Sequence, residues 1–373
     1  METAPAITDA DAVDLYEDEK AELFEAEKDS GYPISYSGTD FDAEGLVRRL
    51  DRGDIIVPNF GYAEDAIDVS PFQRGFVWTR PQMDRFIESL LLGYPIPGIV
   101  LVQQEDKSYL VLDGQQRLKT LAAFYKGIHR GKEFVLTNVA EQFQGLRYET
   151  LSPSLKRMLD NSFIQAIIVK GDKSDASAES IYQVFERLNS GGTQLTPHEI
   201  RVALNTGALV SLLSELNQEV GWRQIYGPVS LRMRDHELIL RILALYHRSA
   251  EYATPMKRYL NKFLRDHRNL SGLHADTIKG LFGQATTLLS EAGARDVLRR
   301  QGQRVNTALL EASVIACMKL LAANPSASVD EVRIGLSRLV GDVDTPRVTS
   351  SGTTNEETVR KRLAIAAKAF GVV

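Results

Sequence analysis

The chain has 373 residues, of which 43% are hydrophobic and 25% charged, with a formal net charge of -5, a balance typical of a water-soluble protein with room for two domains. No apolar run approaches the roughly 20 residues that span a bilayer, and the acidic start is unlike a secretory signal, so we expect a cytoplasmic protein without a membrane segment. A single cysteine, Cys317, excludes an internal disulfide and a cysteine zinc cluster, and we expect it in the core.

The negative charge is concentrated at the start of the chain. Residues 1–30 hold eleven Asp or Glu against two Lys, a net of -9, so the remainder carries +4. With few large apolar residues, the segment 1–38 is predicted to be a mobile extension. Its simplest role is to keep the protein in solution. The alternative is an arm that mimics nucleic acid and covers a basic groove of the same chain.

The next part of the chain, residues 39–207, alternates short strands with helices and predicts a mixed α/β domain. A capping box at Thr196 and Glu199 is expected to open its last helix. The segments around 98–104 and 108–113 are expected to form a hairpin or neighbouring strands. The full set of expected strands is 54–58, 98–104, 108–113 and 162–170, and the expected helices lie within 41–53, 79–92, 113–127, 179–188 and 197–205.

From residue 208 to 373 the spacing of apolar residues predicts amphipathic helices within 211–220, 235–250, 254–268, 274–293, 305–323 and 357–370. The predicted fold class is therefore α+β, a mixed domain followed by an all-helical one. Between residues 220 and 310 we count fifteen Lys or Arg and seven Asp or Glu, a net of +8. The densest positive stretch, a candidate for contacts with DNA phosphates, consists of Lys257, Arg258, Lys262, Arg265 and Arg268.

The strongest local signal is LVLDGQQRLKTL, in which a strand runs through a glycine turn directly into a helix. The first backbone N–H groups of such a helix lack partners, and the helix dipole favours an anion there. Arg117 can bind phosphate with two hydrogen bonds, with Gln115 and Gln116 beside it, and Asp113 would then hold Mg²⁺ or orient water. The alternative is a capped helix, in which Asp113 is the N-cap and Gly114 sets the turn.

Two further stretches combine polar residues with glycine. SPFQRGFVWTRPQ contains Gln73 and Arg74 among aromatic residues, so the arginine is either a ligand for an anion or a stacked structural residue. VFERLNSGGTQLTPHE contains Glu186, Arg187 and Asn189 at a helix end. A helix stop followed by the capping box accounts for its glycines but not for Asn189.

Several catalytic motifs are absent from the sequence. GIHRGKE lacks the spacing of a P-loop, and neither His198-Glu199 nor His236-Glu237 is followed by the second histidine of a zinc protease. DHRNLSGLH has the residue types of a His-Asn-His nuclease without the cysteines and strand pair that frame one, so we interpret it as basic helix surface.

Four segments, PFQRGFVW, IESLLLGYPIPGIVL, YLVLDGQQRLKTLAAF and FERLNSGGTQLTPHEIR, in this order and spacing, resemble the DGQQR domain at the N-terminus of GmrSD-type modification-dependent restriction enzymes. The resemblance covers residues 40–210, and the helical remainder is similar to that of stand-alone members of the family. It implies a ParB/sulfiredoxin-like fold that binds and hydrolyses nucleoside triphosphate and acts on foreign, often modified, DNA. The His-Asn-His nuclease domain that follows in GmrSD-type enzymes has no counterpart here.

The resemblance also implies site residues. Gln73, Arg74, Gly114, Gln115, Gln116, Arg117, Arg187 and Asn189 would bind the nucleotide, Asp113, Arg117 and Glu186 would be catalytic, and Asp113 and Glu186 would hold Mg²⁺. Our first hypothesis is an NTPase whose helical domain binds DNA or a partner subunit of an antiphage system. The competing hypotheses are a non-hydrolysing nucleotide- or DNA-binding switch that changes assembly, with an oligomer as one form, and a DNA-nicking α/β domain.

Overall fold

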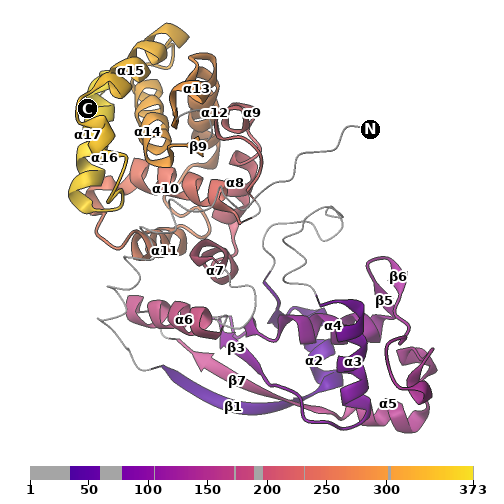
Figure 1. Cartoon of the computed structure of the whole chain (residues 1–373). Helices are drawn as coiled ribbons and strands as arrows, with labels where there is room; N and C mark the ends of the chain where they lie inside the picture. Colours follow the sequence, from indigo (N-terminus) through magenta and orange to yellow (C-terminus); the bar gives the residue numbers. More distant parts are fainter. Residues whose placement is uncertain are drawn as a thin grey trace, which may run out of the picture. The chain divides into compact units, whose positions relative to one another are not determined.

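The structure is a computed structural model that describes residues 34–58, 78–104, 106–171, 174–188, 196–230, 232–300 and 304–372. Its internal contacts divide the chain between Leu204 and Asn205 into two compact units. We call the described residues 34–204 the sheet unit and the described residues 205–372 the helical unit (Figure 1). The predicted α+β class is confirmed: a mixed α/β unit precedes a unit built from helices.

A five-stranded sheet organises the sheet unit, in the order β1-β7-β3-β4-β2. β1 is antiparallel to β7, β7 is parallel to β3, β3 is antiparallel to β4, and β4 is parallel to β2. The expectation that the strands around residues 101 and 110 are neighbours is confirmed. The strands are β1 (Ser35–Asp42), β2 (Ile55–Ile56), β3 (Ile99–Gln103), β4 (Tyr109–Asp113) and β7 (Phe163–Lys170), and a separate two-stranded ladder pairs β5 (Ile128–His129) with β6 (Lys132–Glu133).

Helices cover both faces of this sheet, so residues 99–102 of β3 and 110–112 of β4 are apolar and buried. On one face, Leu101 and Val111 pack against Leu118 and the other apolar residues of four helices. On the other face, Val100 and Leu112 pack against Phe185 and its neighbours. The first face carries α2 (Ala43–Arg52), α3 (Arg80–Leu91), α4 (Gln115–Lys126) and α5 (Pro153–Asp160), and the second carries α6 (Asp175–Leu188) and α7 (Pro197–Leu204).

The helical unit has a helix in each of the six segments expected from the sequence, but the one within 305–323 is not amphipathic. Its central helix α14 is buried on every side and contains Cys317, whose pKa burial raises to about 12. No helix among the described residues has the length and apolar character that crossing a bilayer requires. The helices are α8 (Ala208–Leu216), α9 (Val220–Tyr226), α10 (Arg234–Arg248), α11 (Met256–Asp266), α12 (Ala275–Glu291), α13 (Ala294–Val297), α14 (Thr307–Ala323), α15 (Val329–Gly341), α16 (Thr345–Val348) and α17 (Glu356–Phe370).

Two predictions about the elements need correction. β1 begins at Ser35, so the last residues of the segment that we assigned to a mobile extension belong to the sheet. This strand lies at the sheet edge and is largely exposed, which leaves no clear alternation of apolar residues to predict it from. The second part of the chain is also not purely helical, because β8 (Arg299–Arg300) pairs with β9 (Arg304–Val305). Two-residue strands carry no periodic signal.

Within the sheet unit, Asp84 on α3 holds the segment 134–139 against this helix. Its side chain is fully buried and accepts hydrogen bonds from Arg80 Nε at 2.7 Å and Asn138 Nδ2 at 2.8 Å, and from both the backbone N–H and the hydroxyl of Thr137. Burial alone would raise the pKa of this carboxyl, but the hydrogen bonds from Asn138 and Arg80 lower it below its usual range. The ionised form is therefore the one that stabilises the fold.

We expect Asp84→Asn to lower the free energy of unfolding of the sheet unit by about 2 kcal/mol at pH 7, because a buried, charge-assisted acceptor is lost. A carboxyl group whose pKa is lower in the folded state stabilises the fold fully at pH values above its unfolded-state pKa, near 4. This stabilisation is lost as the pH falls through the folded-state pKa. The free energies of unfolding of Asp84→Asn and wild type should thus become more similar below about pH 4. Urea unfolding followed by Trp78 fluorescence in a Trp222→Phe background measures this difference, because Trp222 is the second tryptophan of the chain. Asp51→Asn, which breaks the exposed pair with Lys126, is the matched control and should change little.

Candidate functional site

The DGQQR segment forms the turn between β4 and α4. The geometry of this turn corrects the alternative in which Asp113 is the N-cap of the helix. Gly114, with φ 94° and ψ 11°, is the N-cap of α4, and no side chain caps the helix. Asp113, which we considered as the cap, instead accepts a hydrogen bond from Arg117 Nη2 at 2.9 Å. The left-handed backbone of Gly114 turns the chain into the helix without a capping side chain, which leaves the carboxylate of Asp113 available for the arginine one turn later.

Arg117 is held where strand and helix meet. Its Nη2 donates to the Gly98 carbonyl at 2.8 Å as well as to Asp113, and its side chain is 14% exposed, against 48% for Asp113. Arg117 Nε is buried and has no hydrogen-bond partner within the described residues. A buried donor without an acceptor is costly and calls for an explanation, such as a ligand or an ordered water. Within the part of the chain that the structure describes, the guanidinium is thus held through Nη2.

Two glycines allow this close packing. A Cβ on Gly114 would lie 2.4 Å from Ile99 Cγ2, and one on Gly98 would lie 2.6 Å from the Gln165 carbonyl oxygen. Both positions therefore require glycine, and together they bring the start of β3 against the turn after β4. Gly98 is a site residue that no motif in the sequence indicates. Its contact with Arg117 is a backbone carbonyl, for which no residue type is a signal.

The neighbouring glutamines of the motif are half-buried. Gln116 Oε1 accepts a hydrogen bond from the backbone N–H of Trp78 at 3.1 Å, so the chain that leads into α3 is fastened to the start of α4. Gln115 lies in the first turn of α4, as predicted. Gln73 and Arg74, which we expect to complete the site, lie outside the described residues.

The third predicted stretch ends α6. Near the start of this helix, Ser177 and Ile181 lie against Gly171, just beyond the end of β7, and further along Phe185 packs in one cluster with Leu112 and Val100. β7 and β3 run in the same direction and β4 runs in the opposite one, so β4 ends at the end of the sheet where β7 begins. Since α6 starts where β7 ends and runs back over the sheet, its last turn lies toward the end of the sheet at which β4 ends. The two motif stretches therefore lie at the same end of the strands, on opposite faces of the sheet.

This last turn of α6 contains the other two described candidates. Glu186 is half-buried and Arg187 is exposed, and neither contacts Asp113 or Arg117 among the described residues. Asn189 lies outside the described residues. The joint site that we expect for Asp113 and Glu186 stays a prediction.

The basic residues in and just after α11 are less exposed, and make more contacts within the helical unit, than their sequence suggests. Lys257 is only 7% exposed, because its position falls on the apolar side of the helix, which disfavours the predicted contact with DNA phosphates. Lys262 and Arg265 each lie 3.7 Å from Asp266, and Arg268 Nε donates to the Thr206 carbonyl. Arg258 is exposed. Most of this positive charge is thus already engaged within the unit.

The DHRNLSGLH segment is structural in its described contacts. His267 is 6% exposed and its Nδ1 lies 2.5 Å from the Ser271 carbonyl oxygen, which closes the turn after α11. Such a buried ring is not placed to act on a substrate. Our interpretation of this segment as basic helix surface needs correction, because α11 ends at Asp266 and the residues that follow form a turn.

Comparison with known proteins yields one finding. Residues 59–205 match the family model described as GmrSD restriction endonuclease, N-terminal domain. The matched range contains the DGQQR turn, α6 and α7, as well as the positions of Arg74 and Asn189. No curated protein and no solved structure matches the chain. The ParB/sulfiredoxin-like fold that the resemblance implies therefore stays a prediction.

Proposed function

We propose, from the match of residues 59–205 to the GmrSD N-terminal domain family, that the protein is a nucleoside triphosphatase of a restriction-type defence system that acts on foreign DNA. The nucleotide binds where β4 turns into α4. The helical unit binds the DNA or a partner subunit. The compartment that fits this role is the cytoplasm, where incoming DNA is met.

The observation that carries the proposal is the state of Arg117. Its guanidinium lies at the N-terminal end of α4, with Nη2 engaged, Nε buried without an acceptor among the described residues, and a carboxylate as its counter-charge. Phosphate oxygens accept two parallel hydrogen bonds from a guanidinium and are also favoured by the N–H groups at a helix N-terminus. One anionic group can therefore use both features at once.

Binding of a triphosphate would change the partner of Arg117. The Asp113 carboxylate, 2.9 Å from Nη2, competes with a phosphate for the same cation. As the phosphate takes over Arg117, Asp113 is released while it is still at the site. Arg117 then balances phosphate charge during transfer to water, and Asp113 is free to orient that water or a metal ion.

Magnesium fits this donor set as a partner of the nucleotide. The described residues contain no group of three or more metal-ligating side chains. Mg²⁺ is usually bound by one or two carboxylates together with substrate phosphates, and it stabilises the charge that develops on the transferred phosphoryl group. Asp113 supplies one such carboxylate at the turn, and Glu186, at the same edge of the sheet, is the proposed second.

The test is phosphate release from each of the four NTPs with Mg²⁺, combined with binding of a fluorescent NTP analogue. We expect Arg117→Ala to weaken nucleotide binding at least about tenfold, since a charge-assisted pair of hydrogen bonds is worth roughly 1.5–3 kcal/mol. Asp113→Asn should bind nucleotide as tightly as wild type or more tightly, because it removes the competing charge, and should lose most of its turnover.

Arg147→Ala is the matched control, because Arg147 forms an exposed ion pair with Glu133 at 3.0 Å in the same unit. It should bind and hydrolyse NTP as wild type does. Equal binding and turnover in wild type, Arg117→Ala and Asp113→Asn would remove the DGQQR turn as the site.

The Asp113–Arg117 ion pair also favours a second candidate function. If nucleotide binding breaks this pair without hydrolysis, the exchange of partners is itself a two-state switch. Such a protein would show the Arg117-dependent binding described above but no phosphate release in any variant. The same experiment thus separates an enzyme from a switch.

A further inference from the structure

The hairpin β5–β6 projects from the sheet unit and is fixed at its base (Figure 1). It is formed by the segment GIHRGKE, in which Arg130 and Gly131, with φ values of 51° and 69°, make the two-residue turn. At the base, the backbone N–H of Phe134 donates to the Gly127 carbonyl at 2.8 Å. Phe134 is fully buried and packs edge to face against Phe124 of α4. The core of the unit therefore fixes where the tip of the hairpin lies.

The tip of this hairpin presents two cations to solvent. The side chains of Arg130 and Lys132 are exposed and make no hydrogen bond or ion pair within the part of the chain that the structure describes. Glu133 follows Lys132 in β6, and neighbouring residues of a strand point to opposite faces. Its carboxylate is thus turned away from Lys132 and pairs with Arg147 at 3.0 Å. The tip and one face of the hairpin are therefore positive.

Arg130 occupies a backbone conformation that other residue types adopt more easily. A two-residue turn with positive φ at both positions favours Asn or Asp followed by Gly, and a long side chain is uncommon there. Gly131 fits this preference, whereas Arg130 does not. A strained residue is a reason to look for a function. Since the Arg130 side chain bonds to nothing among the described residues, that function points to a partner outside the chain.

The positive surface continues from the hairpin to α2. Lys126, the last residue of α4, forms an ion pair with Asp51 of α2 at 2.8 Å. Arg48 and Arg52, one turn apart on α2, are exposed and line an open hollow between α2 and α4. Two carboxylates, Glu44 and Asp51, lie at the same hollow, so five cations against two carboxylates leave a net charge of +3. The five cations, which we call the basic surface, are Arg48, Arg52, Lys126, Arg130 and Lys132.

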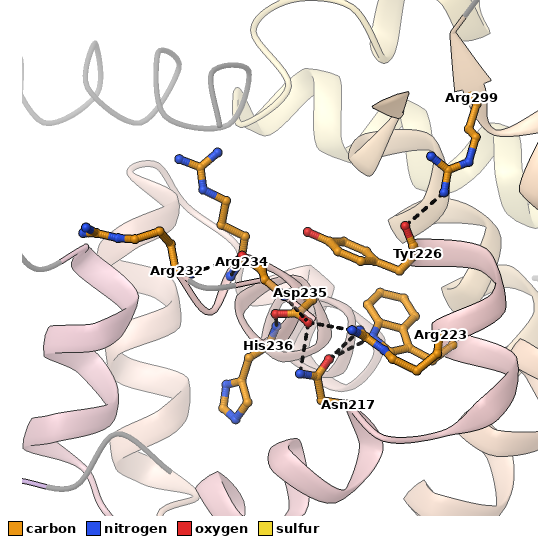
Figure 2. A network of polar contacts seen from close by, with 10 residues as sticks. Asn217, Arg223, Tyr226, Arg232, Arg234, Asp235, His236 and Arg299 are labelled. Atoms are coloured by element: carbon orange, nitrogen blue, oxygen red, sulfur yellow. Dashed lines mark hydrogen bonds and ion pairs between the residues drawn. The ribbon is translucent and has the colours of Figure 1, made fainter. Parts of the chain in front are cut away.

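Several cations of the helical unit are, in contrast, bound within that unit. Arg223 donates to the buried Asp235 at 2.8 Å, and Figure 2 shows its side chain pointing toward this acid. In α11, Lys262 and Arg265 each lie 3.7 Å from Asp266. Four of the five cations of the basic surface have no such partner among the described residues. They remain available to an external polyanion.

We propose that the basic surface binds duplex DNA, with the tip of the hairpin in a groove and the arginines of α2 on the phosphates beside it. Arginine and lysine are usual donors to DNA phosphates. The major groove of B-DNA, about 12 Å wide, admits a two-stranded ribbon such as this hairpin. Because the contacts are to phosphates, binding does not depend on the base sequence.

The inference rests on the proposed function, since it names a surface with which a DNA-acting protein holds its substrate. It adds a DNA contact from the sheet unit to the role proposed for the helical unit. The proposed nucleotide site lies at the start of α4 and the hairpin follows its end, and the 12 residues of this helix span about 18 Å. DNA and nucleotide therefore bind at separate places, and their losses can be measured separately.

The experiment is fluorescence anisotropy of a labelled duplex with the full-length protein, without nucleotide, over a series of salt concentrations. Arg130→Asn/Lys132→Gln should bind several duplex sequences more weakly by the same factor. Each lost phosphate contact lowers the slope of log K against log salt by about 0.9, so the slope should fall by about 2. Arg130→Lys/Lys132→Arg keeps both charges and should retain the wild-type slope. Asn suits the positive φ of position 130, so loss of binding does not come from loss of the turn.

Lys107→Gln/Lys170→Gln is the matched control, because it removes two exposed charges at the end of the sheet where β3 and β7 end. In Figure 1 this end of β7 lies on the far side of the sheet unit from the hairpin. The control should bind duplex as wild type does, and all these variants should hydrolyse NTP at the wild-type rate without DNA.

Two results would overturn the inference and leave the proposed function standing. One is duplex binding by wild type that Arg130→Asn/Lys132→Gln matches in affinity and slope. The other is tighter binding of wild type to a single strand than to the duplex of the same sequence, which contradicts contact with a groove. If wild type binds no DNA while NTP hydrolysis persists, the DNA role in the proposed function is wrong as well.

Discussion

Glu311→Ala should lower the free energy of unfolding of the helical unit by about 3–5 kcal/mol, one of the two largest effects that we expect. Glu311 on α14 is fully buried between two arginines. Its Oε2 accepts from Arg241 Nε of α10 at 2.8 Å, and its Oε1 accepts from Arg362 Nη2 of α17 at 2.7 Å. Removal of the carboxylate leaves two buried cations facing each other without a counter-charge.

We call Arg241, Glu311 and Arg362 the buried triad. Its net charge decides which substitution lowers the free energy of unfolding most. Burial alone would raise the pKa of Glu311, but the charges of Arg241 and Arg362 lower it below its usual range, so the group stays ionised. The triad then carries a net charge of about +1, and loss of the carboxylate raises it to +2, whereas loss of one arginine reduces it to zero. Arg362→Met should therefore cost less than Glu311→Ala, although it also leaves the carbonyls of Val348 and Thr353 without a donor.

Lys361→Met is the control for both variants. Lys361 is adjacent to Arg362 on α17 but forms an exposed pair with Asp344 at 3.0 Å, which is worth about 0–1 kcal/mol. Urea unfolding in a Trp78→Phe background measures all three, because the chain has two tryptophans and Trp222 is the one in the helical unit. An unfolding midpoint for Glu311→Ala equal to that of Lys361→Met would contradict the buried triad.

The triad also shows where prediction from the sequence ends. The helices that contain it follow from the 3.6-residue spacing of apolar positions, and that period is a strong signal in segments of this length. Each charged member, taken alone, looks like an exposed position on its helix. The partners are 70 and 51 residues apart, and nothing local connects them. The same holds for β1, an exposed edge strand whose pairing with β7 depends on the assembled sheet.

The candidate site could likewise be predicted only as far as local sequence signals reach. A strand, a glycine and a helix in sequence are local signals, and the turn at Gly114 has the predicted form. The spacing of Asp113 and Arg117, four residues apart, would also have indicated an ion pair, because such positions are neighbours on a helix. We assigned Asp113 to the N-cap because that residue type is common there. Glycine took the position, since the left-handed turn leaves no room for a side chain.

Gly114→Ala should disrupt the candidate site more than any other single methyl group added to the sheet unit. A φ of 94° is strained for alanine, which costs on the order of 1–3 kcal/mol. The added Cβ would also lie 2.4 Å from Ile99 Cγ2, and Ile99 is 1% exposed in the core. Because the core side chain cannot move away, the turn must move, and Arg117 moves with it away from Gly98 and Asp113.

We therefore expect faster hydrogen exchange in β4 and the first turn of α4, measured by mass spectrometry, together with loss of nucleotide binding comparable to that of Arg117→Ala. Gly93→Ala separates strain from overlap, because Gly93 also has a positive φ, 69°, but has open space around its Cβ position. It should show the cost of strain alone and keep nucleotide binding. Ile99→Ala removes the methyl group that the new Cβ would meet, so the double variant with Gly114→Ala should be less destabilised than the sum of the single variants. Additive losses would mean that the turn tolerates the methyl group, and that the position of Arg117 does not depend on the contact between Gly114 and Ile99.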